Sequence, residues 1–178
     1  LAGPTARASM NPLAIIPVRA GSKGIPGKNL VDCAGRPLMG WTIAAAKASK
    51  LLDLTVISSD STEMLSYADG KKVVGHRRDA ALAGDDISTE AVMADVLQRF
   101  PRHDPIVLLQ ATSPLRTAVH IDEALRLYEE ERADSVVSVV PNHTFLWEGR
   151  GGGIGRPLYD PYRRPRRQDM DGQYAENG

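Results

Sequence analysis

The residues with the clearest chemical potential lie in one short segment near the start of the chain. Glycines at positions 21, 24 and 27 alternate with the cations Arg19, Lys23 and Lys28. Glycine allows a backbone to approach a ligand and turn its N–H groups toward it, and cations offset the charge of a polyphosphate. The segment therefore predicts a phosphate-binding loop, in which Ser22 and Asn29 would serve as neutral donors.

Two common phosphate-binding motifs do not fit this loop. A P-loop has four residues between its glycines and then lysine and a hydroxyl residue. Here five residues separate Gly21 from Gly27, and Asn29 stands where the hydroxyl residue belongs. The dinucleotide motif Gly-x-Gly-x-x-Gly also fails, because Ser22 and Lys23 separate the first two glycines.

The elements that must position this loop alternate between apolar strands and amphipathic helices. We expect strands at 13–16, 54–58, 71–74, 105–109 and 135–140, and helices at 38–49, at 62–68, after Ser88 and from Thr117. This alternation predicts a three-layer α/β sandwich with a mainly parallel sheet. The nearly continuous apolar segment 105–109 is expected in the middle of that sheet, and 135–140 is expected to be another buried strand.

Polar residues follow two of the expected strands, where ligands bind in sheets of this kind. Asp60 and Ser61 follow the second strand and would either cap the next helix or serve the site. Gln110, Thr112 and Ser113 follow segment 105–109, and their amide and hydroxyl groups can bond ribose or sugar hydroxyls without charge. Arg116 could brace that second loop.

Three segments resemble the signatures of the acylneuraminate cytidylyltransferases, the CMP-sialic acid synthetase family. Residues 19–29 resemble the first signature, and residues 109–116 resemble the second, usually Leu-Gln-Pro-Thr-Ser-Pro-Leu-Arg, with Ala111 in place of proline. Residues 167–178 resemble the third, which binds the acidic sugar. The resemblance implies a nucleotide-diphospho-sugar-transferase-like, Rossmann-like sheet and transfer of CMP from CTP to an acidic nine-carbon sugar.

The resemblance also implies roles for individual residues. Lys28 and Arg19 would be catalytic, with Lys28 stabilising the transition state. Nucleotide binding would involve Arg19, Ser22, Lys23, Lys28, Asn29, Arg78, Gln110 and Thr112, and sugar binding would involve Gln110, Ser113, Arg167, Gln168, Tyr174 and Asn177. The neighbouring Arg77 makes the choice of Arg78 ambiguous by one position. No obvious general base is present, and Asp60 and Asp169 are unsupported candidates.

Departures from the family pattern keep alternatives open. Asp171 and Gly172 replace the usual prolines, and Ala175 stands where many members have a second arginine. The chain ends within the third signature, so we expect it to be truncated, and the aspartates that hold Mg²⁺ in the family would follow Gly178. An octulosonate or a phosphonate could therefore be the acceptor, or the protein could be a non-catalytic nucleotide-binding relative.

Composition narrows the class of protein. The chain has 178 residues, with 22 lysines plus arginines and 22 aspartates plus glutamates, which gives no reason to expect nucleic acid or a membrane surface as a partner. Without an apolar segment long enough for a bilayer or a signal peptide, we expect a cytoplasmic enzyme, and the resemblance implies a homodimer. Cys33, the only cysteine, is expected to be a packed thiol. The expected divisions are a leader or cloning remnant at 1–12, a nucleotide-binding domain at 13–140 and a sugar-binding and dimerisation arm at 141–178.

Overall fold

A computed structural model describes residues 10–21, 24–149, 153, 155–169 and 172–177 of the chain. The chain divides into two compact units, Leu1–Val136 and Val137–Asn177. The boundary after residue 140 and the roles given to the segments on either side remain predictions.

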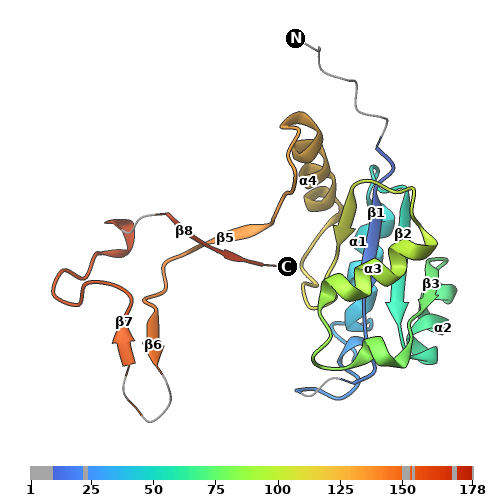
Figure 1. The fold of residues 1–178 in the computed structure, drawn as a ribbon, viewed down its shortest axis with the longest axis horizontal. Helices are drawn as coiled ribbons and strands as arrows, with labels where there is room; N and C mark the ends of the chain where they lie inside the picture. The colour runs from blue at the N-terminus through green and yellow to red at the C-terminus, as the bar shows by residue number, and fades with distance from the viewer. Residues whose placement is uncertain (1–9, 22–23, 150–152, 154, 170–171, 178) are drawn as a thin grey trace. The chain divides into compact units, whose positions relative to one another are not determined.

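The first unit is built on a parallel sheet with the strand order β3-β2-β1-β4 (Figure 1). Its strands are β1 (Leu13–Pro17), β2 (Leu54–Ser59), β3 (Val74–Arg77) and β4 (Ile106–Leu108). In register, Leu13 of β1 is the partner of Leu54 on one side and of Ile106 on the other. Because the strands are parallel, their carboxyl ends meet at one edge of the sheet.

Helices cover both faces of this sheet, as the apolar pattern predicts. The helices α1 (Leu38–Ala48), α2 (Thr62–Gly70) and α4 (Ala118–Glu130) pack on the face that contains Ala14 and Ile16. Helix α3 (Thr89–Arg99) packs through Val96 on the other face, against Leu13 and Ile15, and Figure 1 shows it in front of the sheet. Residues 13–16 are fully buried. The predicted three-layer α/β sandwich is confirmed.

Side-chain caps fix where three helices begin. Ser61 accepts a hydrogen bond from the N–H of Met64 at the start of α2, and Ser88 accepts one from Ala91 at the start of α3. Thr117 and His120 form a reciprocal capping box at the start of α4. The expected starts after Ser88 and Thr117 are therefore confirmed, and Ser61, rather than Asp60, caps α2.

Two strand predictions in this unit are wrong in detail. The third strand is Val74–Arg77 and not 71–74, because the N–H groups of Lys71 and Lys72 donate to carbonyls at the end of α2. Lys72 also adopts a φ of 57°, which is incompatible with an extended strand. The fourth strand was expected in the middle of the sheet, but it lies at an edge of the described sheet, where β1 is its one partner. Its residues are half-buried.

The described residues of the second unit form two antiparallel strand pairs and a short 3₁₀ helix. Strand β5 (Val139–Asn142) pairs with β8 (Gln173–Glu176), β6 (Trp147–Gly149) pairs with β7 (Gly155–Pro157), and η3 spans Arg167–Asp169. The pairing of β6 with β7 forms a hairpin, and residues 150–152 and 154 between the two strands lie outside the described part of the chain.

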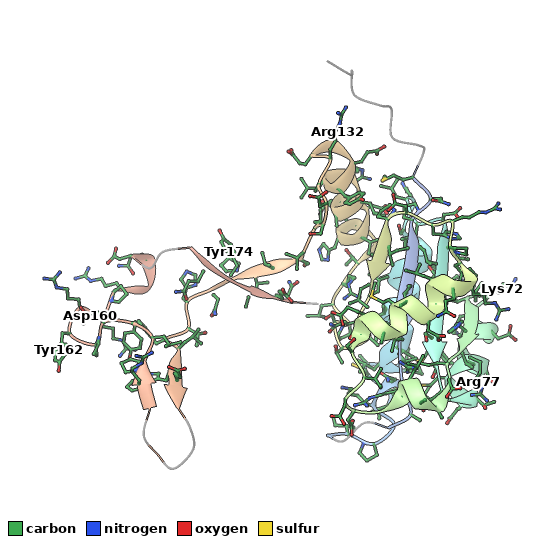
Figure 2. All side chains as sticks on the ribbon, in the orientation of Figure 1. Lys72, Arg77, Arg132, Asp160, Tyr162 and Tyr174 are labelled. Carbon is green, nitrogen blue, oxygen red and sulfur yellow. The ribbon has the colours of Figure 1, made fainter. Side chains whose placement is uncertain are left out.

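The apolar residues of the second unit are mostly exposed. Val137, Val139 and Val140 are 61%, 40% and 43% exposed, so the expected buried strand at 135–140 is wrong, since the pairing begins at Val139 and is antiparallel to β8. Tyr162 is 97% exposed and Tyr174 is 64% exposed (Figure 2). Across both units, no helix of the described residues combines the length and the apolar character that a bilayer crossing requires.

Candidate active site

A cavity of about 520 Å³ lies where β1, β3 and β4 end. Its walls are the loop after β1, the segment between β3 and α3, the first residues of α3, and the loop after β4. The lining residues are Pro17, Val18, Arg19, Gly24, Lys28, Asn29, Arg78, Leu82, Gly84, Asp85, Ile87, Thr89, Val92, Gln110, Ala111 and Thr112. The cavity therefore stands at the edge of the sheet where the sequence predicts a ligand site.

The loop after β1 is followed by a short 3₁₀ helix, η1 (Lys28–Leu30). Gly27 precedes this helix with a φ of 63°, a left-handed conformation that a side chain would strain. Asn29 is 6% exposed, and its Nδ2 donates to the carbonyl of Arg19 at 3.3 Å. These contacts hold Lys28 at the cavity, and no hydrogen bond or ion pair within the described part of the chain engages its ammonium group.

Arg19 forms an ion pair with Asp85, another residue that lines the cavity. Its Nη2 lies 2.7 Å from Oδ1 of Asp85, and its Nη1 donates to the carbonyl of Ala83 at 3.3 Å. Ala83 ends the short helix η2 (Ala80–Ala83), which Asp79 caps through the N–H of Ala81. The loop after β1 is thus tied to the segment after β3.

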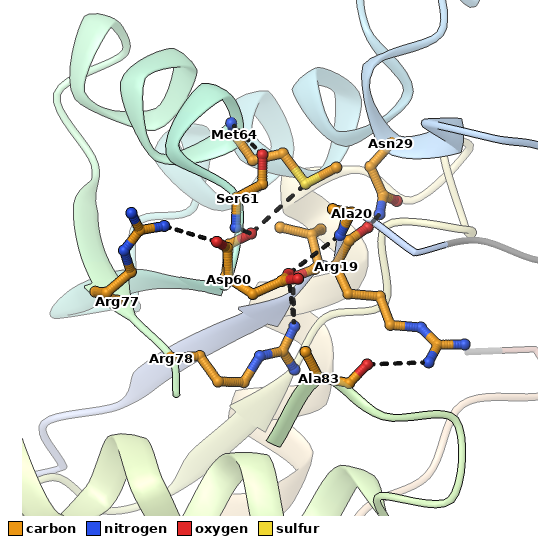
Figure 3. A network of polar contacts seen from close by, with 11 residues as sticks. Arg19, Ala20, Asn29, Asp60, Ser61, Met64, Arg77, Arg78 and Ala83 are labelled. Carbon is orange, nitrogen blue, oxygen red and sulfur yellow. Dashed lines mark hydrogen bonds and ion pairs between the residues drawn. The ribbon is translucent and has the colours of Figure 1, made fainter. Parts of the chain in front are cut away.

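The structure separates the roles of the two neighbouring arginines (Figure 3). Arg78 is 5% exposed, lines the cavity, and donates through Nη2 to the carbonyl of Val18 at 2.6 Å. Burial lowers the pKa of Arg78, and the nearby carboxylate of Asp60 opposes this shift. Arg77 is exposed and donates to the Asp60 carbonyl and to Thr62 Oγ1, at 2.6 and 2.7 Å. Of these two neighbours, Arg78 is therefore the one that lines the cavity.

The loop after β4 is braced from two sides. The carbonyl of Gln110 accepts hydrogen bonds from Arg116 Nη1 at 3.2 Å and from Thr42 Oγ1 at 3.5 Å. Thr42 is fully buried in α1, and burial lowers the pKa of Arg116. The brace expected from Arg116 is thus present, and it leaves the exposed side chains of Gln110 and Thr112 beside the cavity.

The cavity brings together six of the residues that the sequence singles out: Arg19, Lys28, Asn29, Arg78, Gln110 and Thr112. Ser113 is outside its lining, and Ser22 and Lys23 lie outside the described residues. The expected sugar-binding residues Arg167, Gln168, Tyr174 and Asn177 belong to the second unit. Their association with the cavity remains a prediction.

The sequence alone did not predict the contacts of two acidic residues near the cavity, Asp85 and Asp60. Asp85 lines the cavity, seven residues after Arg78 in the chain. Asp60 accepts a hydrogen bond from the N–H of Ala20 at 3.1 Å and is not part of the lining, which argues against it as a general base. In the sequence, only the position of Asp60 after the second strand indicated a place near the site, because its partners Ala20 and Arg78 lie 40 and 18 residues away in the chain.

The described residues supply few metal ligands. They contain no group of three or more histidine, cysteine, aspartate or glutamate side chains that could hold a metal ion. Of the described residues that line the cavity, Asp85 is the one with a carboxylate. Mg²⁺ that arrives with a nucleotide takes most of its ligands from phosphates and water, so one carboxylate is compatible with it.

Comparisons with known sequences agree with the chemistry of the cavity. Residues 13–145 match the model of a family described as Cytidylyltransferase. N-acylneuraminate cytidylyltransferase of Oncorhynchus mykiss is 40% identical over 169 residues, which are 93% of this chain and 39% of that relative. The protein of the same name from Streptococcus agalactiae serotype III is 34% identical over 174 residues, which are 95% of this chain and 42% of the relative. The chain thus spans about two fifths of the length of these curated relatives.

Solved structures share the fold at low sequence identity. A CMP:2-keto-3-deoxy-manno-octonic acid synthetase aligns with a TM-score of 0.62 and 18% identity, over 74% of this chain and 51% of that one. A 4-diphosphocytidyl-2C-methyl-D-erythritol synthase aligns with a TM-score of 0.60 and 17% identity, over 93% and 74%. These similarities confirm the predicted nucleotide-sugar-transferase-like architecture.

Proposed function

The chain belongs to the cytidylyltransferase family, and from this premise we propose that it transfers CMP from CTP to an acidic nonulosonic sugar of the sialic type, with release of pyrophosphate. The relatives named N-acylneuraminate cytidylyltransferase support this choice of acceptor. The observation that carries the proposal is that one cavity is lined both by the cations Arg19, Lys28 and Arg78 and by uncharged polar residues.

The cavity has the two kinds of surface that this reaction needs. Arg19, Lys28 and Arg78 provide positive charge for a triphosphate, while Gln110 and Thr112 provide groups that can bond the hydroxyls of ribose or of the sugar. Because the supporting loops are fixed by η1 and by the brace on Gln110, the reactants would be held in one orientation.

In the proposed reaction, the anomeric hydroxyl of the sugar attacks the α-phosphorus of CTP. A bond forms between the sugar oxygen and phosphorus, the bond to pyrophosphate breaks, and the hydroxyl proton leaves to water. Negative charge grows on the phosphoryl oxygens during this step. Lys28 would donate to those oxygens, since its ammonium group is not engaged by other described residues.

The acidic group of the sugar would be bound by the second unit. We assign its carboxylate to Arg167 and Gln168, because a guanidinium can bond a carboxylate through two parallel hydrogen bonds. Ser113, Tyr174 and Asn177 would contact the remainder of the sugar. The support for these assignments is the resemblance of residues 167–178 to the third family signature and, for Ser113, of residues 109–116 to the second.

We further propose that Mg²⁺ accompanies CTP and that the protein forms a homodimer. Asp85 would supply the protein ligand from the cavity wall, and the bound ion would neutralise charge on the phosphates. The support for the dimer is family resemblance alone, and measurement of the mass in solution would test it.

Pyrophosphate release tests the proposed function. The protein is incubated with CTP, Mg²⁺ and, in separate reactions, N-acetylneuraminate, an octulosonate and a phosphonate. We expect release that depends on the nonulosonic acid. Release only with one of the other acids would contradict the proposed acceptor, and CTP binding without release in any reaction would indicate a non-catalytic relative.

A further inference from the structure

We propose that Asp60 is a positioning residue, which fixes the loop after β1 and Arg78 relative to one another through one carboxylate oxygen. Its Oδ1 accepts the hydrogen bond from the N–H of Ala20 at 3.1 Å and lies 3.9 Å from Nη2 of Arg78 (Figure 3). This inference rests on the proposed function, because its consequence is the placement of groups that would face the triphosphate.

Asp60 is itself held in place by its neighbours in the chain. Ser59, the last residue of β2, is fully buried, and its Oγ accepts a hydrogen bond from the N–H of Ser61 at 3.1 Å. Ser61 then caps α2, and the carbonyl of Asp60 accepts the hydrogen bond from Arg77. The carboxylate therefore projects from a backbone that is fixed on both sides.

The residues that Asp60 contacts are those beside the cavity, although Asp60 is not part of the lining itself. Arg78 and Val18 line the cavity, and they are joined by the hydrogen bond from Arg78 Nη2 to the Val18 carbonyl. Ala20 directly follows Arg19, a further lining residue. A single group outside the cavity thus connects two of its walls.

The charge of Asp60 matters because Arg78 is buried. A buried guanidinium is costly unless a negative group and hydrogen bonds compensate for lost water, and the Nε of Arg78 has no partner among the described residues. Loss of the negative charge would remove this compensation and would also weaken the hydrogen bond from Ala20, because a neutral acceptor binds less strongly than a carboxylate. The N–H of Ala20 is also directed to Asp60, so it is not available to a phosphate while this bond is intact.

Two measurements on Asp60→Asn test the inference. We expect CTP to bind roughly ten- to hundredfold more weakly, the range for loss of an interaction with a charged group. In the ligand-free protein, we expect the Ala20 amide to exchange its hydrogen about tenfold faster, because the neutral amide oxygen of asparagine is a weaker acceptor than a carboxylate oxygen. Asp69→Asn makes the same change of charge on an exposed residue of α2 and should leave both values within twofold of the parent.

A merely structural role would give a different pattern. It would lower the melting temperature but leave the CTP affinity of the folded protein unchanged. If Asp60 acts through Arg78, the loss of affinity in a variant with both Asp60→Asn and Arg78→Gln will be smaller than the product of the two separate losses. Should Asp60→Asn not fold, Asp60→Glu replaces it, with the same expected directions.

Parent-like CTP affinity together with parent-like exchange of Ala20 in the folded Asp60 variant would overturn the inference. This result would leave the proposed function intact. Absence of CTP binding by the parent would instead contradict the proposed function. The exchange of Ala20 in the ligand-free protein would then decide the positioning role by itself.

Discussion

Arg19 Nη2 lies 2.7 Å from Asp85 Oδ1, so a cation of the proposed triphosphate site is paired with a carboxylate in the same cavity. Both side chains are partly exposed, at 34% and 38%, where an ion pair contributes little stability and can exchange partners. An incoming triphosphate would therefore compete with Asp85 for Arg19.

This competition predicts that Asp85→Asn strengthens CTP binding when divalent ions are chelated. The substitution removes both the competing carboxylate and its repulsion of the phosphates, and we expect a gain of about two- to tenfold in affinity. Titration calorimetry in EDTA measures it, with Asp69→Asn as the control. Weaker binding of CTP under these conditions would show that Asp85 contacts the nucleotide favourably.

Lys28→Met should reduce turnover by about 10²- to 10³-fold, because it removes a donor to the oxygens that gain charge in the transition state. The fold should persist, since no described residue forms a hydrogen bond or an ion pair with the ammonium group. Lys50→Met alters an exposed lysine at the end of α1 and provides the control in the pyrophosphate assay. Parent-like turnover of Lys28→Met would remove Lys28 from the mechanism.

Arg167→Gln should raise the KM for the acidic sugar by about ten- to hundredfold, because a bidentate bond to the carboxylate is lost. The affinity for CTP should stay within twofold, since the nucleotide is assigned to the first unit. Arg163→Gln is the matched control. An equal loss of sugar and CTP binding would contradict the separate assignment of the two substrates.

The lowered pKa of Asp122 predicts how the free energy of unfolding of the first unit depends on pH. Burial opposes its ionisation, but hydrogen bonds from Ser49 and from the N–H groups of Lys50 and Leu51 outweigh this effect and hold the pKa of Asp122 below its ordinary value of 3.8. The stabilisation is therefore fully present above about pH 4 and is lost as the pH falls through the folded pKa.

Asp122→Asn should accordingly lower the free energy of unfolding by about 1–2 kcal/mol at pH 7, and the difference from the parent should shrink as the pH falls below 4. Urea titrations across this range measure the effect. Glu123→Gln, an exposed neighbour in α4, should show no such pH dependence. A difference that is constant with pH would mean that the carboxylate charge is not involved.

The fold was largely predictable because its first unit follows simple periodic patterns. The apolar residues 13–16 predict a fully buried strand, and Ser88 and Thr117 mark the starts of α3 and α4 by their capping chemistry. Local patterns do not determine the order of strands, so segment 105–109 was expected inside the sheet although β4 lies at its described edge. The turn at Lys72 depends on backbone bonds to α2, which the pattern of side chains does not specify.

The candidate site was predictable where its residues form a motif and not where they meet across the chain. Lys28 and Gln110 belong to separate signatures, and the structure lines one cavity with both. Spacing alone could not separate Arg77 from Arg78, because the distinction depends on which side chain is buried after β3. The contact of Asp60 with Ala20 joins residues 40 positions apart, which no local pattern specifies.

The central claim is that the loop after β1 and the loop after β4 bind one molecule of CTP together. Hydrogen–deuterium exchange of the parent protein with and without CTP and Mg²⁺ tests it most directly. We predict slower exchange at residues 17–30 and at 109–116, with no change at the carboxyl end of α4. Protection of only one of these loops, or of neither, would contradict a shared nucleotide site.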